Sequence, residues 1–116
     1  MKIKMYVMIC CLGLALTAQP GFARSAYERQ IPNGGVNSCD NCHDPDTFAE
    51  NAFADAFGAN GRIWNAALAA RDSDGDGASN GRELNDPAGT WIAGNPAPGG
   101  TVTNPGDASS KPPPAA

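Results

Sequence analysis

The stretch from Asp72 to Glu83 constrains the fold more than any other part of this 116-residue chain. Aspartates stand at the first, third and fifth places, a glycine at the sixth and a glutamate at the twelfth. This is the spacing of the EF-hand loop, in which glycine permits a sharp turn and acidic oxygens surround a calcium ion. Without a cation, carboxylates held so close would repel one another. The sequence therefore predicts a calcium site whose ligands are Asp72, Asp74, Asp76, Ala78 (through its carbonyl), Asn80 and Glu83.

Two residues distinguish this loop from a paired EF-hand. The eighth place holds Ser79, where a paired loop carries an apolar residue that contacts its partner. Pro87 follows Glu83 closely, and proline cannot continue a helix because it lacks the N–H donor. We therefore expect an isolated, structural calcium loop with a short exiting helix, and not a calcium switch.

The first 23 residues have the pattern of a signal peptide. Two lysines precede an apolar run from Met5 to Ala18, and Gly21-Phe22-Ala23 places small residues at a cleavage site. The run is shorter than the roughly 20 residues that span a bilayer. We expect a secreted or periplasmic protein with no membrane anchor after cleavage. The cleaved segment would take Cys10, Cys11 and every methionine with it.

The charge and length of the remaining chain exclude several classes of function. The formal net charge is −4, and it becomes more negative once Lys2 and Lys4 are removed. An acidic surface disfavours nucleic acid as a partner, since binding to phosphates requires a basic footprint. We expect one small monomeric domain over residues 24–94, followed by a proline-rich, disordered tail over residues 95–116.

A body of about 70 residues usually needs a staple such as a metal, disulfide or cofactor. Thr47 to Glu50 form a capping-box pattern, and Phe48, Phe53 and Phe57 recur at helical spacing before Gly58. A second helix is expected over residues 63–71, and an extended segment over residues 27–31. The predicted fold is thus small and mainly α or irregular, with two short helices, the calcium loop and Trp91 packed back on the body.

Cys39-Asp-Asn-Cys42-His43 is the pattern of covalent c-type haem attachment. In that arrangement, two thiols bond to the haem vinyl groups and the histidine ligates the iron. Export agrees with this interpretation, because haem is attached outside the cytoplasm. Two alternatives stay open: a Cys39–Cys42 disulfide in an oxidising compartment, and a redox-active CxxC, which the lack of a βαβ pattern disfavours.

The supply of further ligands limits both haem chemistry and catalysis. His43 is the only histidine, and no methionine follows the predicted cleavage site. A haem here would therefore lack the usual second axial ligand. With one histidine, neither a hydrolytic triad nor a zinc protease site can be assembled, so we do not expect an enzyme. The two remaining hypotheses are an exported, calcium-stabilised monohaem protein with a redox partner, and a haem-free calcium-binding protein that meets an extracellular receptor.

The body resembles the temptin family. The resemblance rests on Asn51-Ala-Phe53, Gly61-Arg-Ile-Trp64, the Asp-rich loop and Glu83-Leu84, continues through Asp86-Pro87 to Trp91, and includes the early Ile31-Pro32-Asn33-Gly34. Temptins are small secreted proteins, first known as waterborne pheromone components of marine molluscs. The resemblance implies a small secreted fold with a metal site on the Asp-rich loop.

This chain departs from the family pattern in its cysteines. The family is described around a disulfide whose cysteines flank the metal loop. Here Ala70 and Arg71 precede the loop, and Ala88 and Gly89 follow Asp86-Pro87. The two cysteines of the body lie instead in the CxxCH motif, which favours haem attachment. A pheromone role does not follow from the resemblance, because signalling depends on a surface that a shared fold does not specify.

Overall fold

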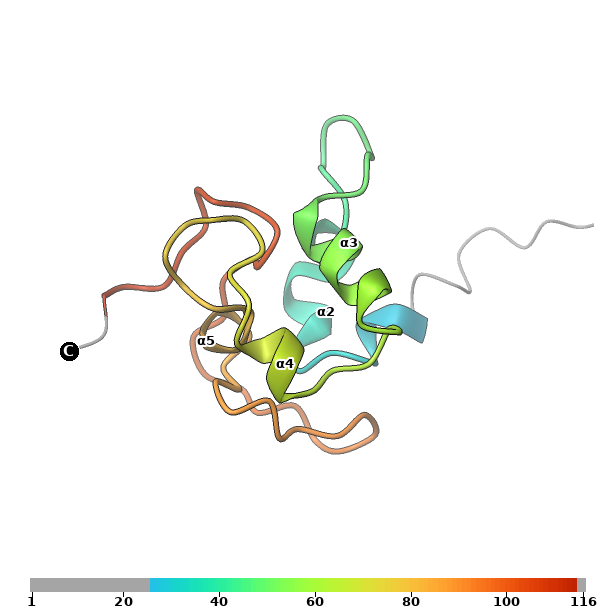
Figure 1. Ribbon diagram of the computed structural model, residues 1–116, viewed down its shortest axis with the longest axis vertical. Helices are drawn as coiled ribbons and strands as arrows, with labels where there is room; N and C mark the ends of the chain where they lie inside the picture. The colour runs from blue at the N-terminus through green and yellow to red at the C-terminus, as the bar shows by residue number, and fades with distance from the viewer. Residues whose placement is uncertain (1–25, 115–116) are drawn as a thin grey trace, which may run out of the picture.

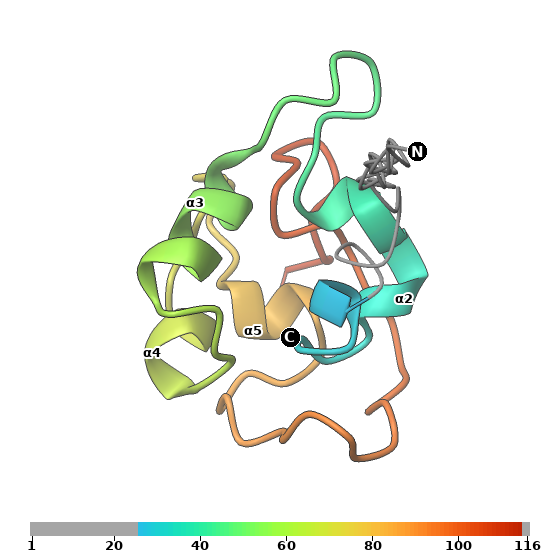
Figure 2. The same ribbon diagram turned by 90° about the vertical axis from the view of Figure 1, so that its right-hand side faces the viewer.

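The computed structural model describes residues 26–114, so the predicted signal peptide lies outside the described part of the chain. Within these residues the structure consists of short helices joined by long loops: α2 (Gly34–Asn37), the 3-10 helix η1 (Ser38–Asn41), α3 (Ala52–Ala59), α4 (Ala66–Ala69) and α5 (Asn80–Glu83). Figure 1 shows these elements, and Figure 2 shows α5 between α3 and α4 on one side and α2 on the other. The prediction of a small, mainly helical or irregular fold is confirmed.

Helix α3 begins later than the sequence predicts. Its N-cap is Asn51, whose side chain accepts a hydrogen bond from the Ala54 backbone N–H at 3.0 Å. Thr47 does not cap this helix, because its hydroxyl donates to the Asp44 carboxylate and accepts from the Ala49 N–H in a tight turn. Phe48 lies in that turn with a φ of 60° and is 72% exposed. The predicted capping box is therefore wrong, and so is the prediction that Phe48 belongs to the apolar stripe of the helix.

Helix α4 is shorter than the predicted span of residues 63–71. Asn65 has an extended backbone and caps the helix by accepting from the Leu68 N–H at 3.0 Å. Ile63 precedes this cap and is 58% exposed. Trp64, by contrast, is buried, and its indole Nε1 donates to Asp86 Oδ2 at 2.7 Å. The N-terminal segment also differs from prediction: residues 26–28 are helical, and a turn with Gln30 N–H bound to the Tyr27 carbonyl replaces the expected extended backbone.

The core is assembled from the inner faces of these short helices. Its buried members are Ile31, Phe53, Ala56, Phe57, Trp64, Leu68, Ala69 and Leu84. Trp91 packs against this cluster, as predicted, and its backbone N–H donates to Asp86 Oδ2 at 2.9 Å. Asp86 therefore joins two tryptophans that are far apart in the sequence. In the described residues, no helix is long and apolar enough to cross a membrane.

The segment after residue 94, expected to be a disordered tail, lies against the body in the structure as far as the described residues reach. The Asn33 side chain binds the start of this segment: Nδ2 donates to the Gly99 carbonyl, and Oδ1 accepts from the Gly99 N–H. Thr103 N–H donates to the Glu83 carbonyl at 2.9 Å, and Asn104 Nδ2 donates to the Asp40 carbonyl at 2.8 Å. Val102 adds apolar contact with the core. Side-chain amides bound to backbone carbonyls thus supply the contacts that its poor apolar content does not.

Candidate metal centre and the CxxCH segment

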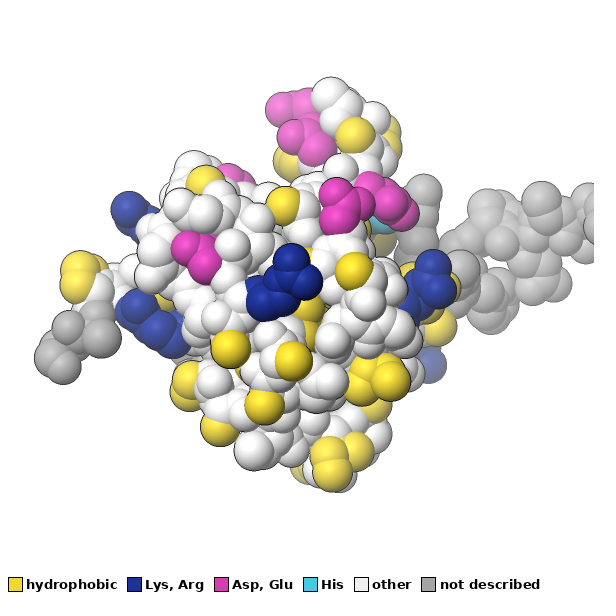
Figure 3. All heavy atoms as spheres, viewed as in Figure 1, with side chains coloured by type: hydrophobic (Ala, Val, Ile, Leu, Met, Phe, Trp, Pro, Cys, Tyr) yellow, Lys and Arg dark blue, Asp and Glu magenta, His cyan; other side chains and the backbone are white. Residues whose placement is uncertain are grey.

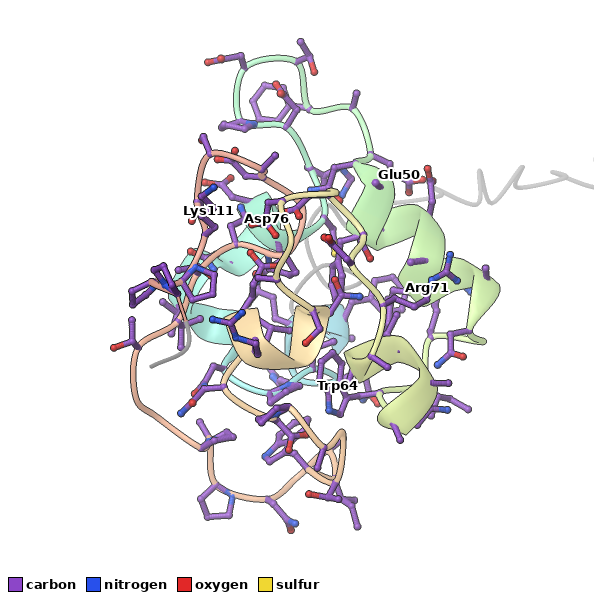
Figure 4. The ribbon with its side chains drawn as sticks, turned by 60° about the vertical axis from the view of Figure 1, so that its left-hand side comes forward. Glu50, Trp64, Arg71, Asp76 and Lys111 are labelled. Atoms are coloured by element: carbon purple, nitrogen blue, oxygen red, sulfur yellow. The ribbon has the colours of Figure 1, made fainter. Side chains whose placement is uncertain are left out.

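The three aspartates of the calcium-type loop converge in space. Asp72, Asp74 and Asp76 each offer a carboxylate oxygen, and these oxygens lie within 4.8 Å of one another. Figure 4 shows Asp76 in the loop that leads into α5, with Lys111 on the neighbouring C-terminal segment. The structure therefore brings together the first three ligands that the spacing predicts.

The loop is held in this shape by its own backbone. Asp72 Oδ1 accepts from the Gly75 N–H at 2.9 Å, and Asp72 Oδ2 accepts from the Gly77 N–H at 2.8 Å. Gly75 and Gly77 adopt φ values of 73° and 90°, which side chains disfavour. The hydrogen bonds from the Gly77, Asp74, Gly75 and Asp76 groups favour the ionised carboxylate and lower the pKa of Asp72. Asp72 therefore stays charged at the entrance to the loop.

Glu83 is the last predicted ligand of the site. It is the last residue of α5 and is fully buried. Three buried carboxylate oxygens in this region have no hydrogen-bond partner: Asp74 Oδ2, Asp76 Oδ2 and Glu83 Oε2. Burial raises the pKa of Glu83 to about 9, and the charges of Asp74 and Asp76 add to that rise. Burial likewise raises the pKa of Asp74 to about 6.

Unpartnered acidic oxygens are costly in a protein interior, because a buried charge needs a counter-charge or hydrogen bonds. A hard dication with six to eight oxygen ligands removes this cost. The donor set of carboxylates and carbonyls suits calcium, and no nitrogen or sulfur ligand faces it among the loop residues. The side chains present therefore fit the ion that the sequence predicts.

The remaining two predicted ligands have additional structural roles. Asn80 is buried, and its Nδ2 donates to the Leu68 carbonyl and to Ser73 Oγ, both at 2.9 Å. The amide thereby braces the loop against α4, a role that the spacing of the loop does not predict. Ala78 is buried at the bottom of the loop, and its N–H donates to Asp76 Oδ1 at 2.7 Å. Their roles as calcium ligands stay predictions.

The exiting helix is a single turn, as Pro87 predicts. Ser79 accepts from the Arg82 N–H at 3.2 Å, so the eighth residue of the loop is the N-cap of α5. Gly81 is required in this turn, since a Cβ there would stand 2.6 Å from the Asp86 carbonyl oxygen. A short helix tightly turned back on itself is consistent with an isolated loop.

The CxxCH motif forms a tight helical turn. The N–H groups of Cys42 and His43 both donate to the Cys39 carbonyl, at 3.1 and 3.0 Å. Cys39 and Cys42 are half-buried free thiols, so the alternative of a Cys39–Cys42 disulfide is not formed in this structure. Cys39 Sγ instead lies 3.7 Å from a carboxylate oxygen of Glu28 and donates to it.

His43 is oriented by a backbone group. Its Nδ1 lies 3.0 Å from the Phe48 carbonyl oxygen. A carbonyl only accepts, so Nδ1 carries the proton in this contact and Nε2 keeps a free lone pair. This is the arrangement in which a histidine ligates a metal through Nε2 while a second group fixes the ring. Within residues 26–114, the donor atoms of Cys39, Cys42 and His43 form no compact cluster like that of the three aspartates.

Burial raises the pKa of Cys42 to about 11, and the neighbouring Glu50, Cys39 and Glu28 charges add to it. Redox-active CxxC sites depend on a cysteine with a lowered pKa, because the thiolate is the attacking species. The pKa of Cys42 is raised and not lowered. A raised pKa disfavours thiol–disulfide exchange at Cys42.

Comparisons with known proteins agree with the resemblance seen in the sequence. A family model described as Temptin C-terminal matches residues 21–107. A protein of Aplysia californica named Temptin is 35% identical over 94 residues, which is 72% of this chain and 75% of that protein. No solved structure gives a significant match. The matched region includes the calcium-type loop, the CxxCH segment and the C-terminal segment as far as Asp107.

Proposed function

The chain belongs to the temptin family, and on this premise we propose that it is a secreted calcium-binding protein that acts as a binding module outside the cell. Calcium in the Asp72–Glu83 loop is structural in this proposal. The loop residues hold the ion, and the ion in turn stabilises a domain with a small apolar core. The interaction partner is an extracellular receptor or another secreted protein, and no catalytic step is invoked.

One observation carries the calcium proposal. Asp74 Oδ2, Asp76 Oδ2 and Glu83 Oε2 are buried and lack any hydrogen-bond partner. Two of these groups come from the loop and the third from α5, so a bound cation would join the loop to the helix. The same contact would reach the C-terminal segment, because Thr103 Oγ1 donates to Glu83 Oε1 at 3.3 Å.

Calorimetric titration of the mature protein with CaCl2 tests this proposal. We expect one ion per chain, and we expect Glu83→Gln to lower the affinity at least tenfold, because an amide lacks the charge and the two-oxygen grip. Asp55→Asn is the matched control, since Asp55 is an exposed carboxylate on α3 and not part of the loop. Equal affinities for wild-type protein and Glu83→Gln would refute the proposed site.

A second candidate function adds a haem at Cys39, Cys42 and His43. The observation in its favour is the contact between His43 Nδ1 and the Phe48 carbonyl, which leaves Nε2 available to an iron. Two free thiols on the same turn would bond to the vinyl groups. When bound, the haem supplies one-electron redox chemistry, and the partner would then be a redox protein. The haem-free interaction protein is the alternative.

A visible spectrum and an intact mass separate these two candidates. The protein is exported from a bacterial host that carries the haem-attachment machinery. A Soret band and a mass increase of one haem would support attachment, and Cys39→Ala/Cys42→Ala should lose both. A colourless protein with the mass of the bare chain would overturn the haem candidate and leave the calcium proposal standing.

A further inference from the structure

A hollow lies beside the CxxCH turn, between that turn and α3. Its volume is about 310 Å³, at the lower end of the range of roughly 300–1,000 Å³ typical of small-molecule sites. A second, narrower hollow adjoins it and shares the walls formed by Tyr27, Cys42, His43 and Phe57. Cys39 and Ile31 line the narrower part. Cys42 and His43 therefore line both hollows, and Cys39 lines the narrower one.

The α3 side of this hollow includes small residues. Ala54 and Gly58 stand one helical turn apart and both line it. A Cβ placed on Gly58 would meet no atom within 4 Å. Small residues at this spacing leave room for a planar group to lie against the helix, beside the ring of Phe57. Tyr27 completes the apolar wall by packing edge-on against Phe57, with ring centroids 6.2 Å apart.

The wider hollow also carries a positive charge. Arg62 lines it, and the guanidinium carbon lies 5.3 Å from the centre of the Tyr27 ring. The residue has a φ of 57°, which is unfavourable for a side chain, and its N–H is bound to the Phe57 carbonyl at 2.8 Å. Within residues 26–114 Arg62 forms no ion pair. Two acidic residues, Glu50 and Asp55, also line the hollow, and Figure 3 shows acidic side chains beside the histidine.

Haem has matching polarity, with vinyl groups along one edge and two propionates at another. We infer that this hollow is the haem seat of the protein, with the vinyl edge at Cys39 and Cys42, the ring against Ala54 and Gly58, and a propionate at Arg62. The inference rests on the haem candidate proposed above. In attachment, each S–H adds across one vinyl C=C bond. Sulfur bonds to one carbon and hydrogen to the other, so no oxidant or reductant is consumed.

The hollow can be filled without touching the motif. Gly58→Leu places a branched side chain where the structure has open space, and Gly58→Ala is the matched control. Both are exported with the haem-attachment machinery, and the haem-to-protein ratio is measured by pyridine haemochrome absorbance and intact mass. We expect a ratio near one for the wild type and Gly58→Ala, and at least a tenfold loss for Gly58→Leu. The calcium-dependent rise in melting temperature should be unchanged in both, which confirms folding.

Arg62→Gln tests the polar end of the seat, with Arg71→Gln as the control because Arg71 is exposed beside the calcium loop. Loss of a positive charge near the propionate disfavours the reduced haem, so Arg62→Gln should lower the reduction potential and Arg71→Gln should not. Full haem attachment to Gly58→Leu, or equal potentials for the two arginine variants, would overturn the seat while leaving haem attachment intact. A wild-type protein without haem would overturn both.

Discussion

The Asp72–Glu83 loop and the CxxCH segment (residues 38–50) are organised in opposite ways. In the loop, the groups that orient the carboxylates come from the same twelve residues: Gly75 and Gly77 donate to Asp72, and Ala78 donates to Asp76. Outside the loop, Asn80 Nδ2 donates to the Leu68 carbonyl of α4, and Glu83 accepts from Thr103. The loop thus contains most of what shapes its site.

The CxxCH segment depends on residues far along the chain. Asn41, at the centre of the turn, is fully buried, and its Nδ2 donates to the Gly34 carbonyl at 2.8 Å. Asn104 binds the Asp40 carbonyl from 64 residues away, and Asn51 Nδ2 donates to the Asn41 carbonyl at 3.0 Å. The walls of the adjoining hollow come from α3 and from Tyr27. A local motif therefore gains its surroundings only from the tertiary fold.

The two regions are joined by one strap, residues 101–110. Thr103 contacts Glu83 at the calcium site, while Asn37 Nδ2 donates to the Thr103 carbonyl at 3.1 Å beside the CxxCH turn. A contiguous, charged loop can therefore be recognised from spacing alone, whereas an attachment turn needs distant partners.

Calcium removal should have the largest effect. At a free calcium concentration 1,000 times its dissociation constant, binding stabilises the native state by about 4 kcal/mol. For a domain of this size that corresponds to a melting temperature about 15–30 °C higher than in EDTA. Differential scanning calorimetry should show this rise in wild-type protein and its absence in Asp76→Ala.

Cys39→Ala/Cys42→Ala is the control for this measurement and should keep the full calcium effect. If the double cysteine variant lost the rise, the CxxCH segment and the loop would be one energetic unit, and the comparison would fail.

The pH dependence of the calcium-free protein should be the next largest effect. The pKa of Glu83 is about 9 in the fold against an ordinary 4.5, so the folded state binds the proton more tightly than the unfolded state. Stability is then highest below about pH 4.5 from this group and falls as pH rises towards 9, by up to about 1.4 kcal/mol per pH unit. Asp74, with a pKa of about 6, adds to the fall at the acidic end.

Thermal melts in EDTA between pH 5 and pH 9 measure this dependence. Glu83→Gln should flatten the curve, because an amide does not titrate. Saturating calcium should also reduce the slope, since it stabilises the ionised carboxylates. A wild-type stability that rises with pH in EDTA would show that burial does not control these groups.

Two buried asparagines offer a matched pair of smaller effects. Asn41→Ala and Asn80→Ala each remove a buried amide that donates two hydrogen bonds. Each should lower the free energy of unfolding by about 1–3 kcal/mol in urea titrations. Calcium affinity distinguishes them: Asn80 braces the loop, so its variant should bind calcium several-fold more weakly. Asn41→Ala should bind calcium as the wild type does, and an equal loss in both would contradict the separation of the two regions.

The smallest effect is expected at the strap. Asn104→Ala removes the bond to the Asp40 carbonyl and should cost about 1 kcal/mol. Hydrogen exchange at the Thr103 N–H, which is bound to the Glu83 carbonyl, should accelerate in the variant. If the Thr103 N–H exchanges rapidly in the wild type and equally fast in Asn104→Ala, the result would instead support the disordered tail that composition predicts.

Several features of the fold could be predicted from the sequence because each depends on neighbouring residues. The aspartate spacing predicted a cluster that the structure forms, and Pro87 predicted the short α5. The start of α3 could not be predicted, since Thr47-Phe-Ala-Glu50 resembles a capping box but the Thr47 hydroxyl donates to Asp44 and accepts from the Ala49 N–H in a local turn. Asn51 then serves as the cap, because its amide is held at the Asn41 carbonyl by the fold.

Composition was a poor guide after residue 94 for a related reason. A segment with little apolar content gains few hydrophobic contacts, so its polar composition predicts disorder. The structure holds it through Asn33, Asn37 and Asn104, whose amides pair with backbone groups more than 60 residues away. Nothing in the local sequence marks these asparagines as long-range contacts.

The sequence by itself determined the chemistry available to this protein: a contiguous set of oxygen donors for a hard cation, and two thiols with a histidine at the spacing of haem attachment. The tertiary structure decided which atoms are buried without partners, that Nδ1 of His43 is bound to the Phe48 carbonyl, and that Cys42 and Arg62 line one hollow beside α3. The physical reason is how far apart the interacting residues lie along the chain. Ligand identity and turn geometry arise between neighbours in the chain, whereas burial and the shape of a hollow arise only when distant segments pack together.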